Sequence, residues 1–461
     1  MKSYGGLYEP FLSDENIRLA IVESSENKRE RPLVRTIYEK PDLFIPAVRE
    51  YAKNFKNEEH TPVEIYDGIK HKKRKIIIPA YTEQIVHHMF IQVLKPIIMR
   101  GMYKHSYGSV PGVGGCDGAK VIEKWIRNDP KNMKYCLKMD IYHFYPSADQ
   151  ELFREKLAAT IKDERFLAVG LEITRVVSEG FPLGFYCSPW FANWTLQPLD
   201  YYIKQELGAP HYMRYMDDMV IFSPNKRKLA KYREKIDQYL QERLHLRLRG
   251  DWQIFRFDYI TKEIDPKTGE AKHRGRALDY MGFVFYRDRT ILREGIMLNA
   301  TRLARKIAKQ EKPNIYSLKR MMAYKGYIDH TDTYNMYLEW IKPYVTFQYC
   351  QRRISKYDKR RAKQNMKGWK TSRSTERPEE LDIASSKTTV YIRKNIREVE
   401  TGEGEQKVRM FEYEEKSMTK EEFIAYADIL DAAQKALQNE VDISAIKDAL
   451  CELDSMIGGE E

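Results

Sequence analysis

The feature that most constrains this chain is a pair of adjacent aspartates, Asp217 and Asp218, inside the apolar stretch "HYMRYMDDMVIFSP". Strand-forming segments rarely contain adjacent carboxylates, because unpaired charge at a half-buried position costs free energy. The pattern predicts two short strands joined by a tight turn that carries the pair. An isolated Asp-Asp pair is more often a simple turn or a helix cap, so its meaning depends on what else the chain brings to it.

A third aspartate, Asp140, ends another apolar segment, "MKYCLKMD", which predicts a buried strand. Phosphoryl transfer by two metal ions needs carboxylates from different chain segments that converge on ions about 3.5–4 Å apart. Mg²⁺ prefers hard oxygen ligands and keeps several waters, so two or three acids suffice. We therefore expect Asp140, Asp217 and Asp218 to meet in space, where bound metal would offset their charge.

Length and composition set the broad class of protein. A chain of 461 residues suggests about three domains. Its five cysteines are scattered and form no CxxC pair, which argues against both a disulfide framework and a zinc site. The sequence has no apolar run of about 18 residues and no signal-peptide core, so we expect a soluble, cytoplasmic protein with no membrane association.

The net charge of +12 is unevenly distributed. Residues 375–461 hold 11 basic and 22 acidic residues, whereas the rest of the chain holds 68 basic and 45 acidic ones. A body this basic is typical of proteins that bind polyanions. The densest basic run, residues 351–373, is either a solvated face or a nucleic-acid contact, and its candidate contact residues are Arg352, Arg353, Lys359, Arg360 and Arg361. The acidic end could cover this surface, mediate self-association or bind a basic accessory protein, and the oligomeric state stays open.

Sequence blocks occur along the chain in a diagnostic order: "KMDIYHFYPS", "GFPLGFYCSP", "YMDD" and "YMGF", preceded by the basic segment "KKRKIIIPA". In this order they resemble the reverse transcriptase family. The likeness is strongest to bacterial enzymes of the group that includes diversity-generating retroelements, retrons, group II introns and antiphage defence systems. The resemblance runs from about residue 1 to 350 and implies an α+β right-hand polymerase fold, with fingers, an antiparallel-sheet palm and a helical thumb.

The resemblance and the local patterns together divide the chain into four parts. The N-terminal region and fingers are expected at 1–135, and the palm with interleaved fingers elements at 136–290. A helical thumb with the basic segment follows at 291–374, and an acidic extension at 375–461. Within these parts, "LDYMGFVFY" and "ILREGIML" are expected to form a β pair. The extension is expected to be small, with a β-hairpin around "TGEG" and helices from about residue 419.

Individual site residues are implied by the resemblance. Asp140, Asp217 and Asp218 would be catalytic and would bind two Mg²⁺ ions, with Mn²⁺ able to substitute and the backbone oxygen of Ile141 as a minor ligand. The deoxynucleotide would be bound by Lys73, Arg74, Tyr145 and Gly184, with Tyr145 excluding a ribose 2′-hydroxyl by its bulk. The primer grip, a tight turn that holds the primer 3′ end, would be Tyr280, Met281 and Gly282.

The implied function is that of an RNA-directed DNA polymerase, a nucleotidyltransferase that copies a dedicated RNA template with deoxynucleotides from a DNA or RNA primer. The template would be a structured non-coding RNA, in an antiphage defence system or a bacterial or prophage retroelement. Three alternatives stay open. They are a mutagenic reverse transcriptase of a diversity-generating retroelement, an RNA-templated RNA polymerase, and a catalytically silent RNA-binding scaffold. Tyr145 argues against the RNA polymerase.

The chain departs from the family pattern at three places. Leu183 stands where many members carry glutamine, which bears on how strictly the incoming base is checked. Ser188-Pro189 stands where diversity-generating enzymes typically have Ser-Gln, which argues against the mutagenic class. The segment "RLRGDWQIF" lacks the lysine often found near the pyrophosphate, and Gln253 or Arg249 could replace it.

Overall fold

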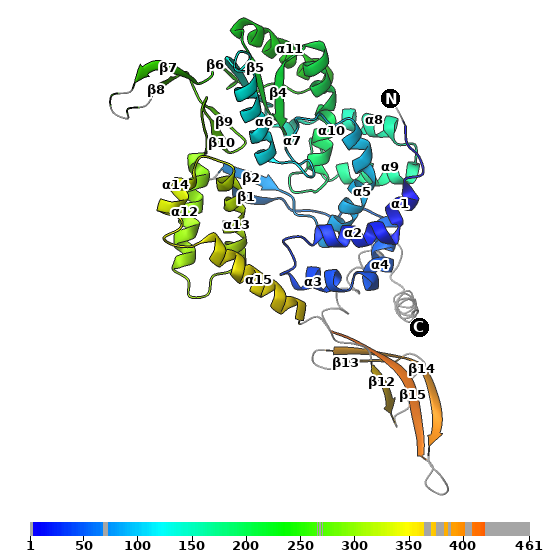
Figure 1. Cartoon of the computed structure of the whole chain (residues 1–461). Helices are drawn as coiled ribbons and strands as arrows, with labels where there is room; N and C mark the ends of the chain where they lie inside the picture. Colours follow the sequence, from blue (N-terminus) through cyan, green and yellow to red (C-terminus); the bar gives the residue numbers. More distant parts are fainter. Residues whose placement is uncertain are drawn as a thin grey trace.

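The structure is a computed structural model that describes residues 3–67, 72–264, 266, 269, 271–363, 370–374, 382–385, 389–401 and 408–419. Helices and antiparallel sheets alternate along the chain, and a four-stranded sheet lies between a helical N-terminal half and a second helical group (Figure 1). This arrangement of palm, fingers and thumb confirms the predicted α+β right-hand fold.

The palm sheet carries the acidic residues. It consists of β3 (Tyr135–Asp140), β4 (His211–Tyr215), β5 (Asp218–Ser223) and β6 (Gln253–Arg256), paired antiparallel in the order β4-β5-β3-β6. The two strands predicted around the Asp-Asp pair are β4 and β5, joined by Met216 and Asp217. In the central pairing, Asp140 is the register partner of Asp218.

Both faces of the palm sheet are buried, which explains why its strands are apolar throughout. Met219 and Ile221 of β5 belong to a core formed mainly with the N-terminal half, whereas Val220 and Phe222 belong to a second core formed with the C-terminal helices. Successive side chains of a strand point to opposite faces, so this alternation follows from the strand itself. The acidic pair therefore lies where the two cores meet.

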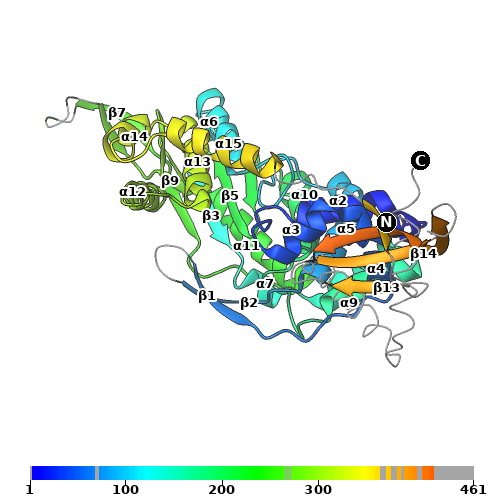
Figure 2. The same ribbon diagram turned by 90° about the horizontal axis from the view of Figure 1, so that it is seen from below.

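The N-terminal half begins with four helices, α1 (Tyr8–Leu12), α2 (Asp14–Ser24), α3 (Pro32–Glu39) and α4 (Pro41–Lys53). The side chain of Ser13 accepts a hydrogen bond from the backbone N–H of Asn16 and so caps α2. The hairpin of β1 (Val63–Asp67) and β2 (Lys72–Ile76) follows and runs along one edge of the molecule in Figure 2. Next comes the long helix α5 (Tyr81–Arg100), whose many buried side chains place it in the core.

Five further helices lie between the long helix and the second strand of the palm: α6 (Gly115–Asn128), α7 (Phe144–Ser147), α8 (Gln150–Thr160), α9 (Glu164–Thr174) and α10 (Ser188–Tyr201). Asp149 and Asp163 accept hydrogen bonds from backbone N–H groups in the first turns of α8 and α9. A π-helical turn at Tyr202–Glu206 ends α10. Helix α11 (Lys226–Leu244) follows β5 and buries one apolar stripe against the sheet.

The C-terminal half contains two small sheets and the thumb. β7 (Tyr259–Ile264) pairs with β8 (Ala271–Arg274), and β9 (Leu278–Tyr280), β10 (Phe283–Phe285) and β11 (Thr290–Leu292) form a three-stranded sheet. The prediction of a strand over "ILREGIML" was wrong beyond Leu292, because α12 (Glu294–Ala308) begins there and buries Met297 among the thumb helices. The thumb continues with α13 (Ile315–Asp329), α14 (Tyr334–Trp340) and α15 (Phe347–Lys363).

The C-terminal part of the chain contains a separate four-stranded antiparallel sheet, and its first strand lies before residue 375, in the segment expected to belong with the thumb. Its strands are β12 (Lys370–Ser374), β13 (Asp382–Ser385), β14 (Thr389–Thr401) and β15 (Val408–Thr419). The predicted hairpin is confirmed, since β14 pairs with β15 over its length with one irregularity between Lys394 and Arg397. The helices predicted from about residue 419 lie outside the described residues.

Two expectations about the kind of protein can be compared with the described part of the chain. Cys116, Cys136, Cys187 and Cys350 are free thiols, as expected from their scattered positions. None of the helices described has both the length and the apolar character that crossing a membrane requires.

Candidate active site

The β4–β5 turn determines where the acidic pair points. Tyr215 pairs with Asp218, so Met216 and Asp217 form the turn, and Met216 has a positive φ of 55°. The backbone N–H of Ile141 donates to the carbonyl oxygen of Asp217 at 3.3 Å, which joins the turn to the end of β3. The structure therefore brings the ends of β3 and β5, and with them the carboxylates at 140, 217 and 218, to one place.

The surroundings disfavour ionisation of two of these acids. Burial raises the pKa of Asp217 to about 6, and the nearby Asp140 carboxylate adds to the effect. Burial raises the pKa of Asp218 to about 7, with Lys138 acting against the shift and Asp140 and Asp217 adding to it. Neighbouring carboxylates that repel one another in this way are a typical binding site for a divalent cation.

Only a few cations face the acids within the described residues. The Nζ of Lys138 lies 3.9 Å from Oδ2 of Asp218, and Nη1 of Arg249 lies 3.4 Å from Oδ2 of Asp140. Oδ1 of Asp218 is buried without a hydrogen-bond partner. Three carboxylates with one oxygen left unsatisfied fit a hard divalent ion, and Asp140 and Asp218 also line a cavity of about 390 Å³.

Tyr145 lies beside the acids on α7. Burial raises the pKa of its hydroxyl and the charge of Asp217 raises it further, so the hydroxyl lies within electrostatic range of that carboxylate. The preceding residue, Phe144, is 2% exposed and belongs to the core. Tyr145 is partly buried against the same core, so it is the more accessible of these two aromatics.

The fingers hairpin separates the two predicted phosphate-binding cations. Lys73 and Arg74 are neighbours on β2, so their side chains leave opposite faces of the hairpin. Arg74 acts electrostatically on Asp217 and lowers its pKa slightly against the larger effects of burial, whereas Nζ of Lys73 pairs with Glu64 at 2.7 Å. This geometry favours Arg74 as the residue on the side of the acids.

Gly184 makes a different close contact from the predicted one. Its φ is +108°, and a Cβ there would lie 2.1 Å from the carbonyl oxygen of Ile77. The backbone N–H of Ile77 donates to the oxygen of Leu183 at 2.7 Å, so this loop is hydrogen-bonded to the segment that follows β2. This contact with the protein's own backbone is enough to require glycine at this position, and the expected contact with the deoxynucleotide stays a prediction.

The predicted primer grip is a two-residue turn between β9 and β10. Tyr280 pairs with Phe283, and Met281 and Gly282 both have positive φ, 53° and 89°, as a tight hairpin turn of the primed type requires. The buried Tyr280 donates its hydroxyl hydrogen to the carbonyl oxygen of Asp218 at 2.8 Å. The turn is thus attached directly to the strand that carries the acidic pair.

The remaining predicted residues lie further from the acids. Arg352, Arg353 and Lys359 are exposed on α15. Arg360 and Arg361 belong to the same helix, but their side chains lie outside the described residues. Figures 1 and 2 both show α15 running from the thumb toward α3, and the hydroxyl of Tyr357 donates to Glu30 at 2.6 Å.

Of the two residues proposed to replace the family's lysine, Arg249 contacts the acids. It forms the ion pair with Asp140 described above, and its backbone N–H donates to the Asp140 carbonyl oxygen at 2.8 Å. Oε1 of Gln253 accepts a hydrogen bond from Arg276 instead, at 2.6 Å. Both residues line the cavity next to Asp140.

Sequence reasoning missed Lys138. It lies two residues before Asp140 on β3 and therefore on the same face, a spacing from which its place beside the acids could have been deduced. Its ammonium donates to the carbonyl oxygen of Asp279 at 2.7 Å as well as facing Asp218. Lys138 thus links the acids to the strand that leads into the Tyr280 turn.

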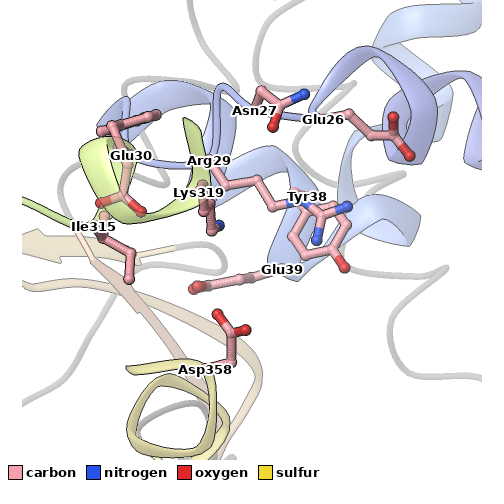
Figure 3. A pocket seen from close by; sticks show the side chains of 10 residues that line it. Glu26, Asn27, Arg29, Glu30, Tyr38, Glu39, Ile315, Lys319 and Asp358 are labelled. Carbon is pink, nitrogen blue, oxygen red and sulfur yellow. The ribbon is translucent and has the colours of Figure 1, made fainter. Parts of the chain in front are cut away.

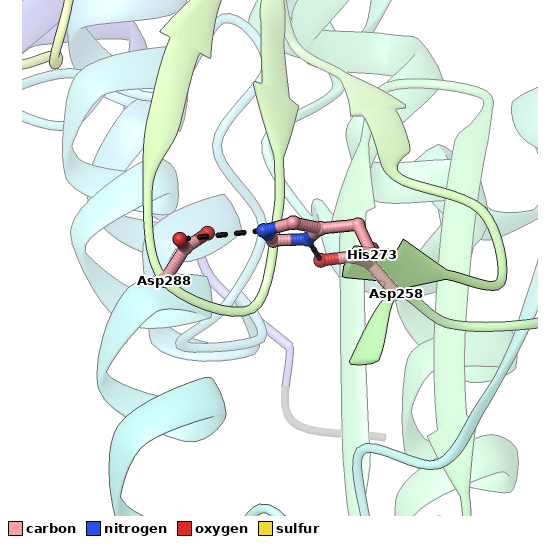
Figure 4. Close-up of side chains that lie close together, drawn as sticks. All are labelled: Asp258, His273 and Asp288. Carbon is pink, nitrogen blue, oxygen red and sulfur yellow. Dashed lines mark hydrogen bonds and ion pairs between the residues drawn. The ribbon is translucent and has the colours of Figure 1, made fainter. Parts of the chain in front are cut away.

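Sequence reasoning also missed a second group of polar residues on the C-terminal side of the palm, Asp258, His273 and Asp288 (Figure 4). Nδ1 of His273 lies 2.8 Å from Oδ2 of Asp258, and Nε2 lies 3.4 Å from Oδ2 of Asp288. Because each ring nitrogen already faces a carboxylate, the imidazole bridges β8 and the β10–β11 turn. The three residues come from separate segments, and nothing in their spacing could have indicated the contact.

A cavity of about 450 Å³ lies away from the acids, between the N-terminal helices and the thumb (Figure 3). Arg29 stacks over the ring of Tyr38 on one side of it, at 3.7 Å from the ring centroid. Lys319 of α13 and Asp358 of α15 line the other side. Its lining mixes charges of both signs, and it contains none of the predicted site residues.

Comparisons with known proteins give one family match and one curated relative. Residues 59–249 match the family described as "Reverse transcriptase (RNA-dependent DNA polymerase)", a segment that runs from the fingers hairpin to Arg249 and contains all three acids. The chain is 22% identical over 223 residues to Protein YkfC of Escherichia coli (strain K12), a match that covers 39% of this chain and 58% of that protein. The chain therefore spans little more than half the length of this curated relative.

Solved structures give more distant matches. The apo telomerase from Candida tropicalis is 12% identical with a TM-score of 0.38, over 61% of this chain and 57% of that one. The telomerase from Candida albicans in complex with a TWJ fragment of telomeric RNA is 12% identical with a TM-score of 0.37, over 68% of this chain and 63% of that one. The family match is the more specific of these results, and it covers residues 59–249 of this chain.

Proposed function

We propose that this protein is an RNA-directed DNA polymerase that extends a primer on an RNA template with deoxynucleotides. The observation that carries the proposal is the convergence of Asp140, Asp217 and Asp218 at the ends of paired strands, with Oδ1 of Asp218 buried and unpartnered. Such a set of hard oxygen donors fits two Mg²⁺ ions, with Mn²⁺ as a substitute. When bound, the metal would lower the pKa of the primer 3′-hydroxyl and neutralise charge on the triphosphate.

The chain's own residues would position the two substrates on either side of the acids. Arg74, on the side of Asp217, would contact the triphosphate of the incoming nucleotide through charge-assisted hydrogen bonds. Tyr145 would stand against the sugar and exclude a 2′-hydroxyl by volume. On the opposite side, the Tyr280–Gly282 turn would hold the primer 3′ end near Asp218, to whose backbone Tyr280 is bonded.

The RNA template would lie across the basic surface of the molecule. The excess of positive charge outside the acidic extension and the exposed Arg352, Arg353 and Lys359 on α15 support this part of the proposal. Neutralisation of phosphates by such residues releases counterions, so template binding would weaken steeply with salt. The same charge distribution leaves the acidic extension as a surface for an accessory protein.

The biochemical proposal is tested by primer extension on an annealed RNA template with Mg²⁺ and deoxynucleotides. Asp217→Asn and Asp218→Asn should each lower kcat by about 10³-fold or more, because each removes a metal ligand. Asp251→Asn is the matched control, since Asp251 lines the same cavity but pairs with Arg249, and it should stay within about threefold of wild type. Extension by the Asp217/Asp218 variants at the wild-type rate would overturn the proposal.

The biological role is a finer proposal. We propose copying of a dedicated structured RNA in an antiphage defence system or a bacterial or prophage retroelement. Ser188 starts α10, and its hydroxyl donates to the carbonyl oxygen of Pro182 at 2.6 Å. The next residue is Pro189, where the mutagenic class typically has glutamine, and this difference argues against that class. Sequencing of the cDNA made in cells separates the roles. Substitutions concentrated at template adenines would favour diversification instead, and RNA binding without any synthesis would favour a silent scaffold.

A further inference from the structure

Arg214 is a fully buried cation on β4, two residues before the β4–β5 turn. Its side chain is 0% exposed, and a buried charge persists only where it is paired and hydrogen-bonded. The partner is Asp200 of α10, which is 2% exposed. Nε of Arg214 donates to Oδ1 of Asp200 at 2.8 Å and Nη2 donates to Oδ2 at 2.5 Å, so the two side chains form a two-pronged ion pair.

The third nitrogen of the guanidinium reaches the turn itself. Nη1 of Arg214 donates to the carbonyl oxygen of Met216 at 3.0 Å and to Oδ1 of Asn193 at 2.8 Å. The amide of Asn193 in turn donates to the carbonyl oxygen of Gly108 at 2.8 Å. The ion pair is thereby connected to the peptide group that joins Met216 to Asp217.

That peptide group is under conformational constraint. Met216 has a positive φ, which a residue with a side chain adopts only where its surroundings impose it. Its backbone also packs tightly on Gly108, where a Cβ would lie 2.7 Å from the Met216 nitrogen. Arg214 and Gly108 therefore hold the residue before the acidic pair from two sides.

We infer that Arg214 is a positioning residue for the metal-binding acids. Through the Met216 carbonyl it fixes the turn that points Asp217 toward Asp140, and Asp200 and Asn193 fix Arg214. The inference rests on the proposed function, which gives the three acids their role as metal ligands. The hydrogen bonds around Arg214 do not depend on that function. Lysine cannot replace the arginine here, because an ammonium cannot grip Asp200 with two parallel bonds and still reach Met216.

A purely structural role for this cluster makes a different prediction. If the cluster only stabilised the fold, loss of any of its hydrogen bonds would lower stability and leave metal binding unchanged. Tyr212 provides the comparison, because its hydroxyl donates to the same Oδ1 of Asp200 at 2.7 Å and is equally buried, but makes no bond to the turn. Tyr212→Phe thus removes one buried hydrogen bond and leaves the contact with Met216 in place.

The experiment compares Arg214→Lys with Tyr212→Phe in the full chain. Mn²⁺ binding is measured by electron paramagnetic resonance without nucleic acid, and primer extension and thermal unfolding are measured alongside. Arg214→Lys should raise the Kd for Mn²⁺ about tenfold and lower kcat by about 10–100-fold, with the KM for deoxynucleotide within about threefold, because misplaced acids act mainly on the chemical step. Tyr212→Phe should leave Kd and kcat within about twofold.

The outcomes separate this inference from the proposed function. A folded Arg214→Lys protein with wild-type Kd and kcat would overturn the inference, as would equal losses in Tyr212→Phe. If Arg214→Lys does not fold, Asn193→Ala tests the inference in its place. This variant keeps the Arg214–Asp200 ion pair but removes the hydrogen bond between Asn193 and Arg214, and it should still raise the Kd for Mn²⁺ by about threefold. A wild-type protein that binds Mn²⁺ but extends no primer would contradict the proposed function, and the Mn²⁺ comparison would still decide the inference.

Discussion

Asp140 and Asp218 face each other as register partners on β3 and β5, so two repelling carboxylates are held together by the hydrogen bonds of a buried sheet. Strand pairing of this kind fixes the Cβ atoms of opposite residues about 4.5–5.5 Å apart. The protein therefore carries a local electrostatic cost that a bound cation would remove. This relationship leads to a prediction about pH and one about metal.

Asp218→Asn should stabilise the metal-free protein at high pH but not at low pH. An aspartate ionises at about pH 4 in the unfolded chain, whereas the pKa of Asp218 in the folded protein is raised to about 7. The stability cost is therefore absent below about pH 4, grows as pH rises, and is complete above about pH 7. Urea unfolding in EDTA should show a gain on the order of 1 kcal/mol for the variant at pH 8, discounted for the partial exposure of the side chain.

The comparison between pH 5 and pH 8 is made as a difference between variant and wild type. His87 is fully buried and burial lowers its pKa to about 3, so histidines of this kind also change the stability of both proteins at low pH. Their contribution cancels in the difference. A gain of equal size at both pH values would show that ionisation of Asp218 is not its cause.

Addition of Mg²⁺ should stabilise the wild-type protein and not the Asp140→Asn or Asp218→Asn variants. A ligand that binds the folded state at about 100 times its Kd stabilises by about 2.7 kcal/mol. Thermal unfolding at pH 8 with and without Mg²⁺ measures the effect. Asp251→Asn serves as the control, and a shift that persists in the two variants would place the metal elsewhere, with the Asp258–His273–Asp288 group as the next site to examine.

Arg74→Ala should raise the KM for deoxynucleotide about 10–100-fold, because a charge-assisted hydrogen bond to phosphate contributes about 1.5–3 kcal/mol. Lys73→Ala is the matched control. It removes the neighbouring cation from the opposite face of the hairpin, where Lys73 pairs with Glu64, and should change KM by less than about threefold. Steady-state primer extension measures KM for both variants. Equal effects would mean that the hairpin rotates and presents its other face to the substrate when substrate binds.

Tyr145→Ala should lower the preference for deoxynucleotides over ribonucleotides by about 10–100-fold, because the aromatic ring would no longer fill the space beside the sugar. Tyr145→Phe keeps the ring and should keep the preference, which separates the volume of the side chain from its hydroxyl. The ratio of kcat/KM for the two nucleotide types measures discrimination. A retained preference in the alanine variant would assign the discrimination to another residue.

Gly184→Ala should destabilise the protein by about 2–3 kcal/mol, because a Cβ would overlap the Ile77 carbonyl oxygen at a φ that alanine rarely adopts. Gly208→Ala is the control for φ alone. Gly208 also has a positive φ, but a Cβ there would meet nothing within 4 Å, so about 1 kcal/mol is expected. Urea unfolding of the two variants measures the difference, and equal losses would argue against a steric role of Ile77.

The sequence predicted the parts of this fold that depend on local pattern. Short apolar segments predicted β3, β4 and β5, and the acids at their ends predicted which ends meet. Strand ends are marked by the residues themselves, so these predictions needed no knowledge of distant contacts.

Contacts between distant segments were beyond such reasoning. Arg214 looks like an ordinary strand residue until Asp200 and Asn193 of α10 are placed against it. The close approach of Gly184 to Ile77 depends in the same way on two loops that are far apart in sequence. That Lys73 and Arg74 lie on opposite faces of the hairpin could have been deduced, because the side chains of neighbouring residues on a strand point to opposite faces.

The hydrogen bond from the Tyr280 hydroxyl to the Asp218 carbonyl oxygen connects the β9–β10 turn directly to β5, so the turn and the acids would move together. If the thumb helices moved to admit a duplex, this bond would keep the distance between that turn and the acids unchanged. The primer 3′ end would then lie at the same distance from the acids in every cycle of nucleotide addition. Only the movement of the duplex along the molecule would depend on the thumb. Accuracy of alignment and length of product would then be separable properties, one set by the β9–β10 turn and the other by the thumb.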